Sequence, residues 1–411
     1  MDIHFYQKFR LTKKYNLMKN NLFLFLAFLF STTFAQNHVH QVLILNEGLY
    51  GYDSPVSVGA YDPTDEVYAT VVEIDSSRFA SDLIIDSTYF YVAADNKILK
   101  YDLDTYELLS QVNIDGVRNL AIHENYLFAS RGDYDPVTWG AVQYESYLHV
   151  YDKHNLSYVT EFDTTNGPKA TTQNLIVDNG KLYVAINNGF SWGNEEGLVG
   201  VIDANSLDYI SEFDLGDNGK NPDNMMLYDN NLYTVNNKDW SGASISQINL
   251  ETGTVVTKNI SAAPTGCGTS CLKTDKIIFQ ISQDSLLFQW DLMGEDEDNS
   301  SEIGSFENFY ELAEDKINNK FYASSTDYVS YGNIHIYDEN YNLESSFTTG
   351  IAPGTIVFDV RQSLSLEELG IPNFTNKSSY IYDLLGRAYG INDDRPAGIY
   401  IVNGKKVYLS E

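Results

Sequence analysis

The sequence predicts an all-β protein, a seven-bladed β-propeller, and two recurring patterns support this prediction. The first is a short phrase, written YD, ID or WD in most copies, that recurs seven times. Its acidic or amide residue lies at Asp62, Asp102, Asp152, Asp203, Asn249, Asp291 and Asp338. The six intervals between these marker residues average 46 residues. A period of about 40–50 residues, all strand and turn, is typical of a β-propeller.

The second pattern is a strand phrase that precedes six of the markers. It is a run of β-branched and aromatic residues bounded by Asn, Asp or Gly, as expected of half-buried strands. Its copies lie at residues 89–96, 126–133, 181–188, 231–238, 276–283 and 320–327. We expect each marker residue to cap the turn between the two outer strands of its blade, because Asp and Asn side chains accept hydrogen bonds from nearby backbone N–H groups.

The two ends of the repeat region predict how the ring closes. Residues 41–48 read as the second strand of a blade with no first strand before them, and Thr355–Val360 is a strand left over after the last marker. If this last strand pairs with the first blade, the ring has no free sheet edge. We therefore expect the propeller to span residues 41–361.

Residues 1–35 have the features of a signal peptide. The apolar run, Leu22–Phe30, is too short to span a bilayer, and small and polar residues follow it up to Ala35. A membrane anchor or a buried helix is the alternative. With no Cys near the expected cleavage region, no lipoprotein anchor is predicted. The formal net charge of −31 argues against a nucleic-acid partner, because that binding depends on neutralising phosphates.

Long loops are predicted on only one face of the disc. In a four-stranded blade, the loop from the second to the third strand and the blade-to-blade loop open on the same face, and here both are long. Since loops on a rigid scaffold usually carry binding, this face is the expected site. The candidate ligand-binding residues in these loops are Asn46, Tyr50, Arg78, Arg118, Arg131, Tyr134, Trp139, Asn188, Trp192, Asn236, Trp240 and Tyr328.

The chemistry of these residues suggests the kind of ligand. Aromatic rings and amides suit a neutral, polar ligand with a large surface, and the Arg residues suit an acidic or phosphate group. Alternatively, the aromatic residues pack the loops together and the Arg residues pair with nearby acids.

Motifs for catalysis or metal binding are not found. His149 and His335 occupy the same repeat position, three residues before a marker, which indicates a structural role. The acidic stretch Gly294–Glu302 lacks the ligand spacing of an EF-hand, so a solvated turn is preferred to a calcium loop. We expect no catalytic activity and no cofactor or metal. A carboxylate pair able to hydrolyse glycosides remains open, because the separation of acids in space cannot be read from the sequence.

The two cysteines, Cys267 and Cys271, lack the second pair that a structural zinc site needs. In an exported protein, a small disulfide between them that holds one loop is expected, and two free thiols are the alternative.

Several phrases resemble a known family. "VLILNEGLYG" at 42–51, "LYVAINNG" at 182–189 and "LYTVNNKD" at 232–239 resemble the exported YVTN/YncE-like surface propellers of Bacteroidetes, over nearly all of residues 41–361. One branch of that group captures vitamin B12 (cobalamin) at the cell surface and passes it to an outer-membrane transporter. The resemblance implies a corrinoid on the loop face. The chain departs from that branch by lacking a lipidation Cys.

The tail carries a second resemblance. "YDLLGR" at 382–387, "PAGIYIV" at 396–402 and "GKKV" at 404–407 resemble the C-terminal sorting signal of the type IX secretion system. This implies a sorting segment at 378–411, a linker at 362–377, contact with the type IX machinery, and a secreted or outer-membrane-surface location. A terminal hairpin packed on the propeller is the alternative.

Together these patterns predict a non-enzymatic propeller that binds a small molecule or a glycan, with a corrinoid or another nutrient as the sharper expectation. The alternatives are a propeller enzyme, such as a lactonase or a glycan-cleaving enzyme, and a protein or glycan adhesion module. Carboxylates clustered in the central channel would favour the enzyme, whereas Trp and Asn lining would favour binding.

Overall fold

The computed structural model describes residues 37–49, 55–135, 137–266, 269–294 and 299–362, together with 380–383, 386–390, 398–402 and 405–409 of the tail. The chain divides into two units, one formed by His38–Arg361 and the other by the two ends of the chain. The expected signal peptide, Tyr50 and the predicted linker beyond Gln362, which ends β28, lie outside the described residues. None of the helices in the described segments has the length and hydropathy to cross a membrane.

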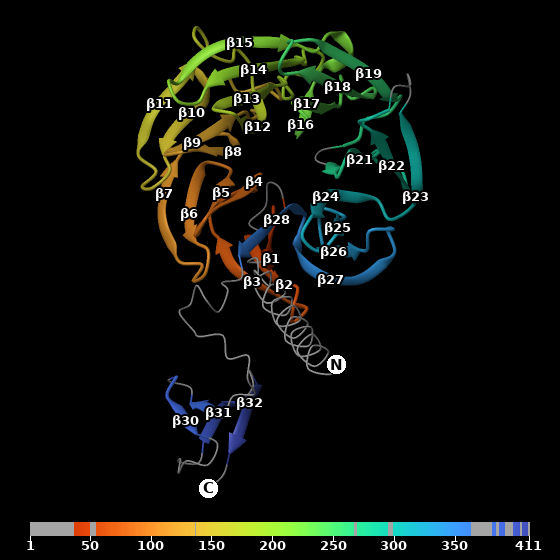
Figure 1. The fold of residues 1–411 in the computed structure, drawn as a ribbon. Coiled ribbons are helices and arrows are strands. Elements are labelled where there is room, and N and C mark those ends of the chain that lie inside the picture. The colour runs from red at the N-terminus through yellow and green to blue at the C-terminus, as the bar shows by residue number, and fades with distance from the viewer. Residues whose placement is uncertain are drawn as a thin grey trace, which may run out of the picture. The chain divides into compact units, whose positions relative to one another are not determined.

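The larger unit is a ring of seven four-stranded antiparallel sheets (Figure 1). Blade 1 consists of β28 (Pro353–Gln362), β1 (Asn37–Asn46), β2 (Val56–Asp62) and β3 (Val67–Ile74). Blade 2 consists of β4 (Asp82–Asp86), β5 (Tyr89–Ala94), β6 (Lys97–Asp102) and β7 (Leu108–Asn113). Blade 3 consists of β8 (Val117–His123), β9 (Tyr126–Arg131), β10 (Ser146–Asp152) and β11 (Tyr158–Asp163). Blade 4 consists of β12 (Thr172–Asp178), β13 (Lys181–Ile186), β14 (Leu198–Asp203) and β15 (Asp208–Asp214).

The other three blades repeat this order. Blade 5 consists of β16 (Pro222–Tyr228), β17 (Asn231–Asn236), β18 (Ala243–Asn249) and β19 (Val255–Ser261), and the short 3-10 helix η1 (Asp217–Gly219) precedes it. Blade 6 consists of β20 (Ser270–Lys273), β21 (Lys276–Gln280), β22 (Leu286–Asp291) and β23 (Ser300–Ser305). Blade 7 consists of β24 (Phe309–Asp315), β25 (Lys320–Ser325), β26 (Tyr331–Tyr337) and β27 (Leu343–Ile351).

The ring closes through its first blade, as predicted. The last propeller strand, β28, is the neighbour of β1 in that sheet. Backbone hydrogen bonds from Glu47 N to Ala352 O (2.9 Å) and from Gly48 N to Ile351 O (3.1 Å) extend the junction into the loops. Strands from the two ends of the sequence therefore share one blade, which removes the free edge that an open ring would expose.

The apolar core lies between the faces of adjacent blades. The second strands are almost fully buried, with Phe90, Phe128 and Phe321 inaccessible to solvent, whereas the outer strand β7 exposes Leu108 and Leu109. Each cluster of buried residues joins two neighbouring sheets, as Leu43 and Leu45 of blade 1 pack with blade 2. The hydrophobic effect thus holds each blade to the next and fixes the first strands around the central channel.

The marker residues cap the turns between the third and fourth strands, and this prediction is confirmed for all seven. In each case a side-chain oxygen accepts the backbone N–H two residues further on. Asp203 Oδ1, for example, accepts from Asn205 N and Ser206 N, both at 2.9 Å. This turn follows from local chemistry, which explains why it recurs so regularly.

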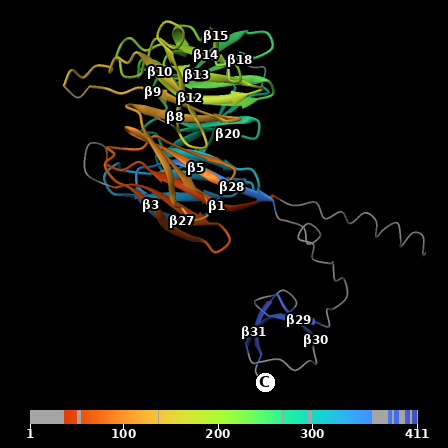
Figure 2. The ribbon, with the colours of Figure 1, turned by 90° about the vertical axis from the view of Figure 1, so that its left-hand side faces the viewer.

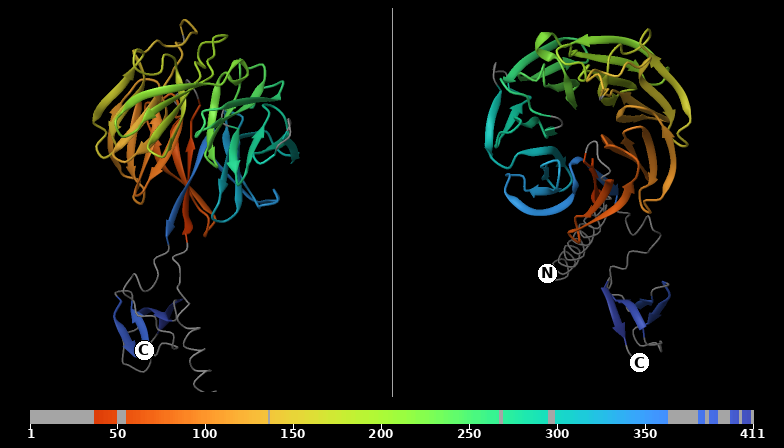
Figure 3. Two further views of the ribbon diagram at one scale, coloured as in Figure 1. Left: turned by 45° about the horizontal axis from the view of Figure 1, so that its top comes forward. Right: turned by 180° about the vertical axis from the view of Figure 1, so that it is seen from behind.

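The two faces of the disc differ in loop length (Figures 2 and 3). Turns between first and second strands are short, such as 124–125 and 179–180, and so are the capped turns on the same face, except for 292–299 in blade 6. The opposite face carries the long connections, such as 187–197 between β13 and β14 and 164–171 between blades 3 and 4. The predicted concentration of loop length on one face is confirmed, and we call it the loop face.

The described tail residues form a second, smaller sheet. Its strands are β29 (Tyr380–Asp383), β30 (Ala388–Gly390), β31 (Gly398–Val402) and β32 (Lys405–Leu409), in the order β30-β29-β31-β32. Ile381 and Tyr400 are buried, and the ring of Tyr389 meets that of Tyr400 edge-on with centroids 5.7 Å apart. The tail is therefore β-rich, as expected, and buries apolar residues of its own.

Candidate functional site at the mouth of the central channel

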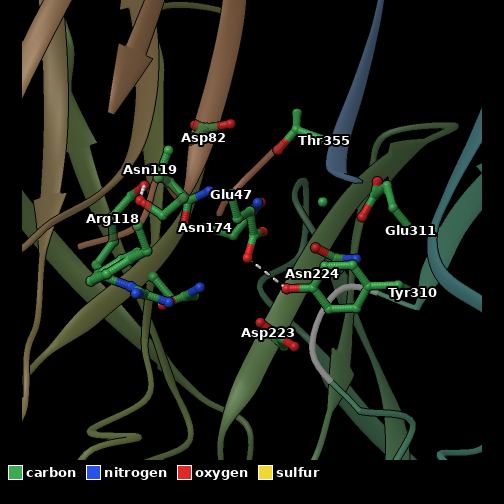
Figure 4. Close-up of a pocket in the computed structure, with 15 residues that line it drawn as sticks. Glu47, Asp82, Arg118, Asn119, Asn174, Asp223, Asn224, Tyr310, Glu311 and Thr355 are labelled. Atoms are coloured by element: carbon green, nitrogen blue, oxygen red, sulfur yellow. Dashed lines mark hydrogen bonds between the residues drawn. The ribbon is translucent and has the colours of Figure 1, made fainter. Parts of the chain in front are cut away.

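A cavity of about 260 Å³ opens where the central channel meets the loop face (Figure 4). Its lining comes from the starts of the first strands, where the blade-to-blade loops end, and from Glu47 directly after β1. The polar lining residues are Glu47, Ser81, Asp82, Arg118, Asn119, Gln173, Asn174, Asp223, Asn224, Tyr310, Glu311 and Thr355. We call this cavity the channel mouth.

A repeated irregularity of the first strands brings two consecutive side chains to the channel mouth. The register between first and second strands shifts between Val117 and Leu120 in β8, between Thr172 and Leu175 in β12, and between Phe309 and Leu312 in β24. In a regular strand, neighbouring side chains point to opposite faces. A bulge leaves residues unpaired and re-aims them, so that both residues of a pair such as Tyr310–Glu311 line the cavity.

Serine hydroxyls accept hydrogen bonds from backbone N–H groups at two of these bulges. The N–H of Asn119 donates to Ser130 Oγ (2.8 Å), and the N–H of Glu311 donates to Ser324 Oγ (2.9 Å). Both serines belong to second strands and are fully buried. An unpaired buried N–H is costly, so the serines stabilise the irregular conformation that the site requires.

Side chains of the channel mouth also join neighbouring blades. Asp82 Oδ2 accepts the N–H of Leu120 (2.7 Å), and Asn174 Oδ1 accepts the N–H of Met225 (3.3 Å). Asn224 Nδ2 donates to the carbonyl of Ser270 (3.0 Å). Part of this polar lining therefore holds the ring together, while other groups are left available to a ligand.

Burial raises the pKa of three carboxyl groups in the channel mouth. The pKa of Glu47 rises to about 7 and that of Asp82 to about 6, in both cases because desolvation outweighs the hydrogen bonds they accept. The pKa of Glu311 is raised well above its usual value by desolvation and by the charges of Glu47, Asp223 and Asp82. Perturbed carboxyl groups that share one cavity mark a candidate functional site.

Two groups shape the space around Glu47. The phenol of Tyr310 donates to Glu47 Oε2 at 2.8 Å (Figure 4). Opposite it, a Cβ on Gly354 would overlap the Glu47 carboxylate, so a residue without a side chain is needed there. The carboxylate is thereby directed into the cavity.

Arg118 is the basic residue in the lining of the channel mouth, and aromatic rings hold it. Its guanidinium carbon lies 5.8 Å from the ring centroid of Phe79 and 5.3 Å from that of Phe190, and its Nε donates to Gln173 Oε1 (3.2 Å). Its positive charge lowers the pKa of Glu47 and of Asp82 less than burial raises it.

A second cavity of about 350 Å³ adjoins the channel mouth and shares Glu47, Phe79 and Arg118 with it. The rest of its lining is mostly apolar: Gly48, Leu49, Tyr328, Val329 and Ala352. We call it the apolar annex. A polar cavity joined to an apolar one is a common composition for a small-molecule site.

Of the residues that the sequence proposed for ligand contact, Arg118 lines both cavities and Tyr328 lines the apolar annex. The structure places four others in internal polar contacts. Asn46 and Asn236 are fully buried and bond to neighbouring serines. Arg78 forms ion pairs with two acids, and Arg131 donates to backbone carbonyl groups. The ion pairs of Arg78 correspond to the structural alternative for the Arg residues, in which they pair with nearby acids.

The three proposed tryptophan residues protrude from the loop face instead. Trp139 and Trp192 are 76% and 79% exposed, and Trp240 is 38% exposed. Tyr134 stacks on Trp139 with ring centroids 6.2 Å apart. Asn188 lies in the loop that carries Trp192 and donates to the carbonyl of Asn194 (2.8 Å). Within the described lining of the two cavities there is no Trp.

The remaining candidates for chemistry have structural surroundings. His149 interacts with Arg131 and Glu161, and burial together with the Arg131 charge lowers its pKa to about 4. Cys271 is buried, and burial raises the pKa of its thiol, while Cys267 lies outside the described residues, so the disulfide stays a prediction. Much of the acidic stretch 294–302 also lies outside them. Among the described residues, no group of three His, Cys, Asp or Glu side chains is placed to hold a metal ion.

Sequence reasoning missed the acids of the channel mouth, although a signal for them exists. Each first strand has, within its first three residues, a polar residue that directly precedes an apolar pair. This position is occupied by Asp82, Asn119, Asn174, Asn224, Ser270, Glu311 and Thr355. An alignment of the first strands, in addition to the loops, would have placed these residues in one ring around the channel.

Comparison with known proteins supports the fold alone. No protein-family model and no curated protein matches the chain. A hypothetical selenium-binding protein from Sulfolobus tokodaii is similar in structure, with a TM-score of 0.59 and 9% sequence identity over 78% of this chain and 93% of that chain. Dihydro-heme d1 dehydrogenase NirN in complex with DHE has a TM-score of 0.51 and 14% identity over 79% of this chain and 76% of that chain. The chain is thus a β-propeller whose structural neighbours include a binding protein and an enzyme.

Proposed function

We propose that this protein is a non-catalytic binding protein of the cell exterior that captures a small ligand at the channel mouth. One observation carries the proposal: consecutive polar side chains from successive blades converge on one cavity at the loop face, with an apolar annex beside it. The repeated bulges make this convergence a built feature of the scaffold. A concave site with few convergent polar groups and perturbed carboxyl groups is the expected form of a binding site.

The cellular role in this proposal follows from the two resemblances. A signal peptide and a type IX sorting segment would deliver the propeller to the outer-membrane surface or the medium, where it would capture a nutrient and pass it to an outer-membrane transporter. The family resemblance implies a corrinoid as that nutrient. A corrinoid is much larger than the cavity of about 260 Å³. It would therefore lie across the loop face, on the exposed Trp residues, with one side group in the channel mouth.

Calorimetric titration of the exported chain tests the proposal. The probes are cyanocobalamin, a panel of neutral oligosaccharides and a panel of small metabolites. Asn119→Ala and Thr355→Ala alter the channel mouth, Trp192→Ala and Trp240→Ala alter the exposed rim, and Glu107→Gln, an exposed residue of a short turn on the opposite face, is the control.

We expect at least one probe whose affinity falls about tenfold in a channel-mouth variant and stays unchanged in Glu107→Gln. A ligand that keeps its affinity in both channel-mouth variants would move the site elsewhere. If Trp192→Ala and Trp240→Ala also leave the affinity unchanged, the rim plays no part in binding.

A second candidate function, catalysis by carboxyl groups, is favoured by one specific observation. Glu47 has a pKa raised to about 7 and lies 2.8 Å from the Tyr310 phenol. A carboxyl group that titrates near neutral pH is suited to general acid–base catalysis. Carboxylates clustered in the central channel are also the feature expected of a propeller enzyme, and the channel mouth has such a cluster.

A screen for hydrolysis separates the two candidates. The mature protein is incubated with aromatic lactones and nitrophenyl glycosides, and product release is followed by absorbance at pH 5 to 8. Turnover that is abolished in Glu47→Gln and retained in Glu107→Gln would replace the binding proposal with an enzymatic one.

A further inference from the structure

The channel mouth has an excess of negative charge in a confined space. Four carboxylates, those of Glu47, Asp82, Asp223 and Glu311, line it together with the single guanidinium of Arg118. Their charges interact, since Glu47, Asp223 and Asp82 each raise the pKa of Glu311. The cavity therefore attracts positive charge and disfavours an anionic ligand.

The protein compensates these carboxylates unequally. Asp82 accepts two backbone N–H groups, from Leu83 (2.9 Å) and Leu120 (2.7 Å). Glu47 accepts the Tyr310 phenol. The carboxylate of Glu311 has no hydrogen-bond or ion-pair partner among the described residues, although it is largely enclosed. A buried carboxylate without donors is costly, and a ligand that supplies N–H donors would remove that cost.

The wall of the cavity also contains an amide oxygen, Oδ1 of Asn119, that is buried without a hydrogen-bond partner. Because this atom has no accessible surface in the open cavity, a ligand there does not reach it. The unpaired acceptor that faces the cavity is the carboxylate of Glu311. An ammonium group has three N–H donors and no acceptor, which suits a site of unpaired acceptors.

Aromatic and apolar surface lies next to this acidic floor. The ring of Tyr310 meets that of Tyr328 edge-on at 5.2 Å between centroids, and Phe79 lies in the walls of both cavities. Aromatic faces attract organic cations. Leu49, Val329 and Ala352 of the apolar annex would accommodate the hydrocarbon part of the same ligand.

From this arrangement we infer that the ligand of the channel mouth is a small organic cation. Its ammonium group binds between the carboxylates of Glu47 and Glu311, and its apolar body occupies the apolar annex beside Phe79. The inference rests on the proposed function and specifies the ligand class of the same site. A bare metal ion fits less well, because among the described acids no three are placed to hold one.

Binding of a cation at this place has a distinctive consequence for protons. The carboxyl group of Glu47 has a pKa of about 7 in the empty site and is partly protonated at pH 6.5. A cation stabilises the ionised form and lowers this pKa, so binding at that pH releases protons. The charged and titratable groups that face Glu47 are Tyr310 and Glu311 of β24, Arg118 of β8, Asp82 of β4 and Asp223 of β16.

The pH dependence of affinity follows with a definite sign. Below pH 5 the carboxyl groups of the channel mouth whose pKa is raised are mostly protonated, and the cation must compete with their protons. As the pH rises through about 7, Glu47 ionises and the affinity for the cation increases. An uncharged ligand would show the opposite trend or none, because it gains nothing from the ionised carboxylates.

Matched pairs of probes test the inference. 2-Phenylethylamine is compared with 2-phenylethanol, and tryptamine with tryptophol, in calorimetric titrations at pH 6.5 in phosphate and in Tris buffer. Spermidine, calcium chloride and neutral cyanocobalamin complete the panel. The protein variants are Glu311→Gln and Glu47→Gln, with Glu107→Gln as the control and circular dichroism as the measure of folding.

We expect an amine to bind while its alcohol does not, with proton release that appears as a difference in heat between the two buffers. Its affinity should fall at least about tenfold in Glu311→Gln, because a buried charge pair is lost, and should not change in Glu107→Gln. Binding of calcium alone, equal binding of amine and alcohol, or no amine bound below about 1 mM would overturn the inference. If cyanocobalamin or a sugar binds and the channel-mouth variants weaken it without proton release, the proposed function stands and the cationic ligand class is wrong.

Discussion

Acidic side chains at the two faces of this propeller behave in opposite ways. At the turns opposite the loop face, the markers Asp102, Asp203 and Asp338 are partly exposed, and hydrogen bonds from backbone and side-chain donors of their own turns lower their pKa. At the channel mouth, Glu47 and Glu311 are also partly exposed but have few donors, and desolvation raises their pKa. The local supply of N–H donors, more than the residue type, decides whether an acid stabilises the fold or is available to a ligand.

The repeat itself separates these two uses. Six of the seven marker positions carry Asp and one, Asn249, carries Asn, because every blade makes the same turn. The polar position of the first strand varies from blade to blade, with Asp, Asn, Ser, Glu and Thr. Seven equivalent turns impose one requirement, whereas a ligand on the channel axis has no sevenfold symmetry and contacts each blade differently. Repeat positions with the same residue in every blade therefore indicate a structural role, and positions that vary between blades indicate the candidate site.

The largest expected effect comes from neutralising an acid whose charged form desolvation disfavours. In Glu47→Gln, the amide keeps the shape and can still accept the Tyr310 phenol, while the buried charge is removed. The unfolded pKa of 4.5 lies below the folded value of about 7, so the wild type loses stability as the pH rises from 4.5 to 7. At pH 8 the variant should be more stable by on the order of 2 kcal/mol, and the gain should be much smaller at pH 5.

Thermal unfolding of both proteins at pH 5, 6, 7 and 8 measures this gain. Glu107→Gln, at an exposed turn, should leave the pH profile unchanged. A Glu47→Gln variant that is less stable than the wild type at pH 8 would show that the carboxylate is compensated, and the contrast between the faces would be lost.

The sequence allowed the fold to be predicted better than the site. The marker turns depend on hydrogen bonds two residues along the chain, and the ring closure depends on one leftover strand, so both are readable locally. The acids of the channel mouth depend on bulges. In a regular strand, Tyr310 and Glu311 would point to opposite sides, and only the shift between Phe309 and Leu312 brings both to the cavity.

The proposed amide contacts illustrate the same limit of local reasoning. Asn46 and Asn236 resemble ligand-binding amides because they end strands at the loop face. In the folded ring both are completely buried and bond to serines of the adjacent strand. Which amide is buried and which is accessible depends on how the neighbouring strand packs, and a repeat phrase does not contain that information. Arg118 was found because the sequence predicts it to lie in a blade-to-blade connection. In the structure it lies near the start of β8, directly after that connection, and lines the channel mouth.

A smaller effect is expected from a channel-mouth residue that already has a structural partner. Asn174 Oδ1 accepts the N–H of buried Met225 in the next blade. Asn174→Ala leaves that N–H unpaired, which should lower the free energy of unfolding by about 1–2 kcal/mol. Chemical denaturation measures the loss, and Asn174→Asp, which retains an acceptor, is the matched comparison. An unchanged midpoint in Asn174→Ala would show that this lining residue does not join the blades.

One marker turn should contribute still less to the free energy of unfolding, because it lies at the protein surface in contact with water. Asn249 is the marker without a charge, and its Oδ1 accepts the N–H groups of Glu251 (3.1 Å) and Thr252 (2.8 Å). Asn249→Ala should cost about 1 kcal/mol at any pH. Asn249→Asp should be nearly neutral at pH 7 and should lose stability as the pH falls below about 4, because the same turn donors lower the pKa of Asp102, Asp203, Asp291 and Asp338. If the stability of Asn249→Asp did not change with pH, the role assigned to the backbone N–H donors of the turn would be contradicted.

The smallest effect on stability is expected at the exposed rim of the loop face. Trp192 is 79% exposed, so Trp192→Ala removes little buried surface and should change the free energy of unfolding by less than about 0.5 kcal/mol. This near-neutrality makes the variant informative, because any loss of ligand affinity can then be attributed to a lost contact. Urea denaturation of the variant and the wild type measures the difference. A loss above about 1 kcal/mol would instead mean that the Trp192 side chain packs against its own loop. The exposed rim would then stabilise the fold, as the marker residues of the opposite face do.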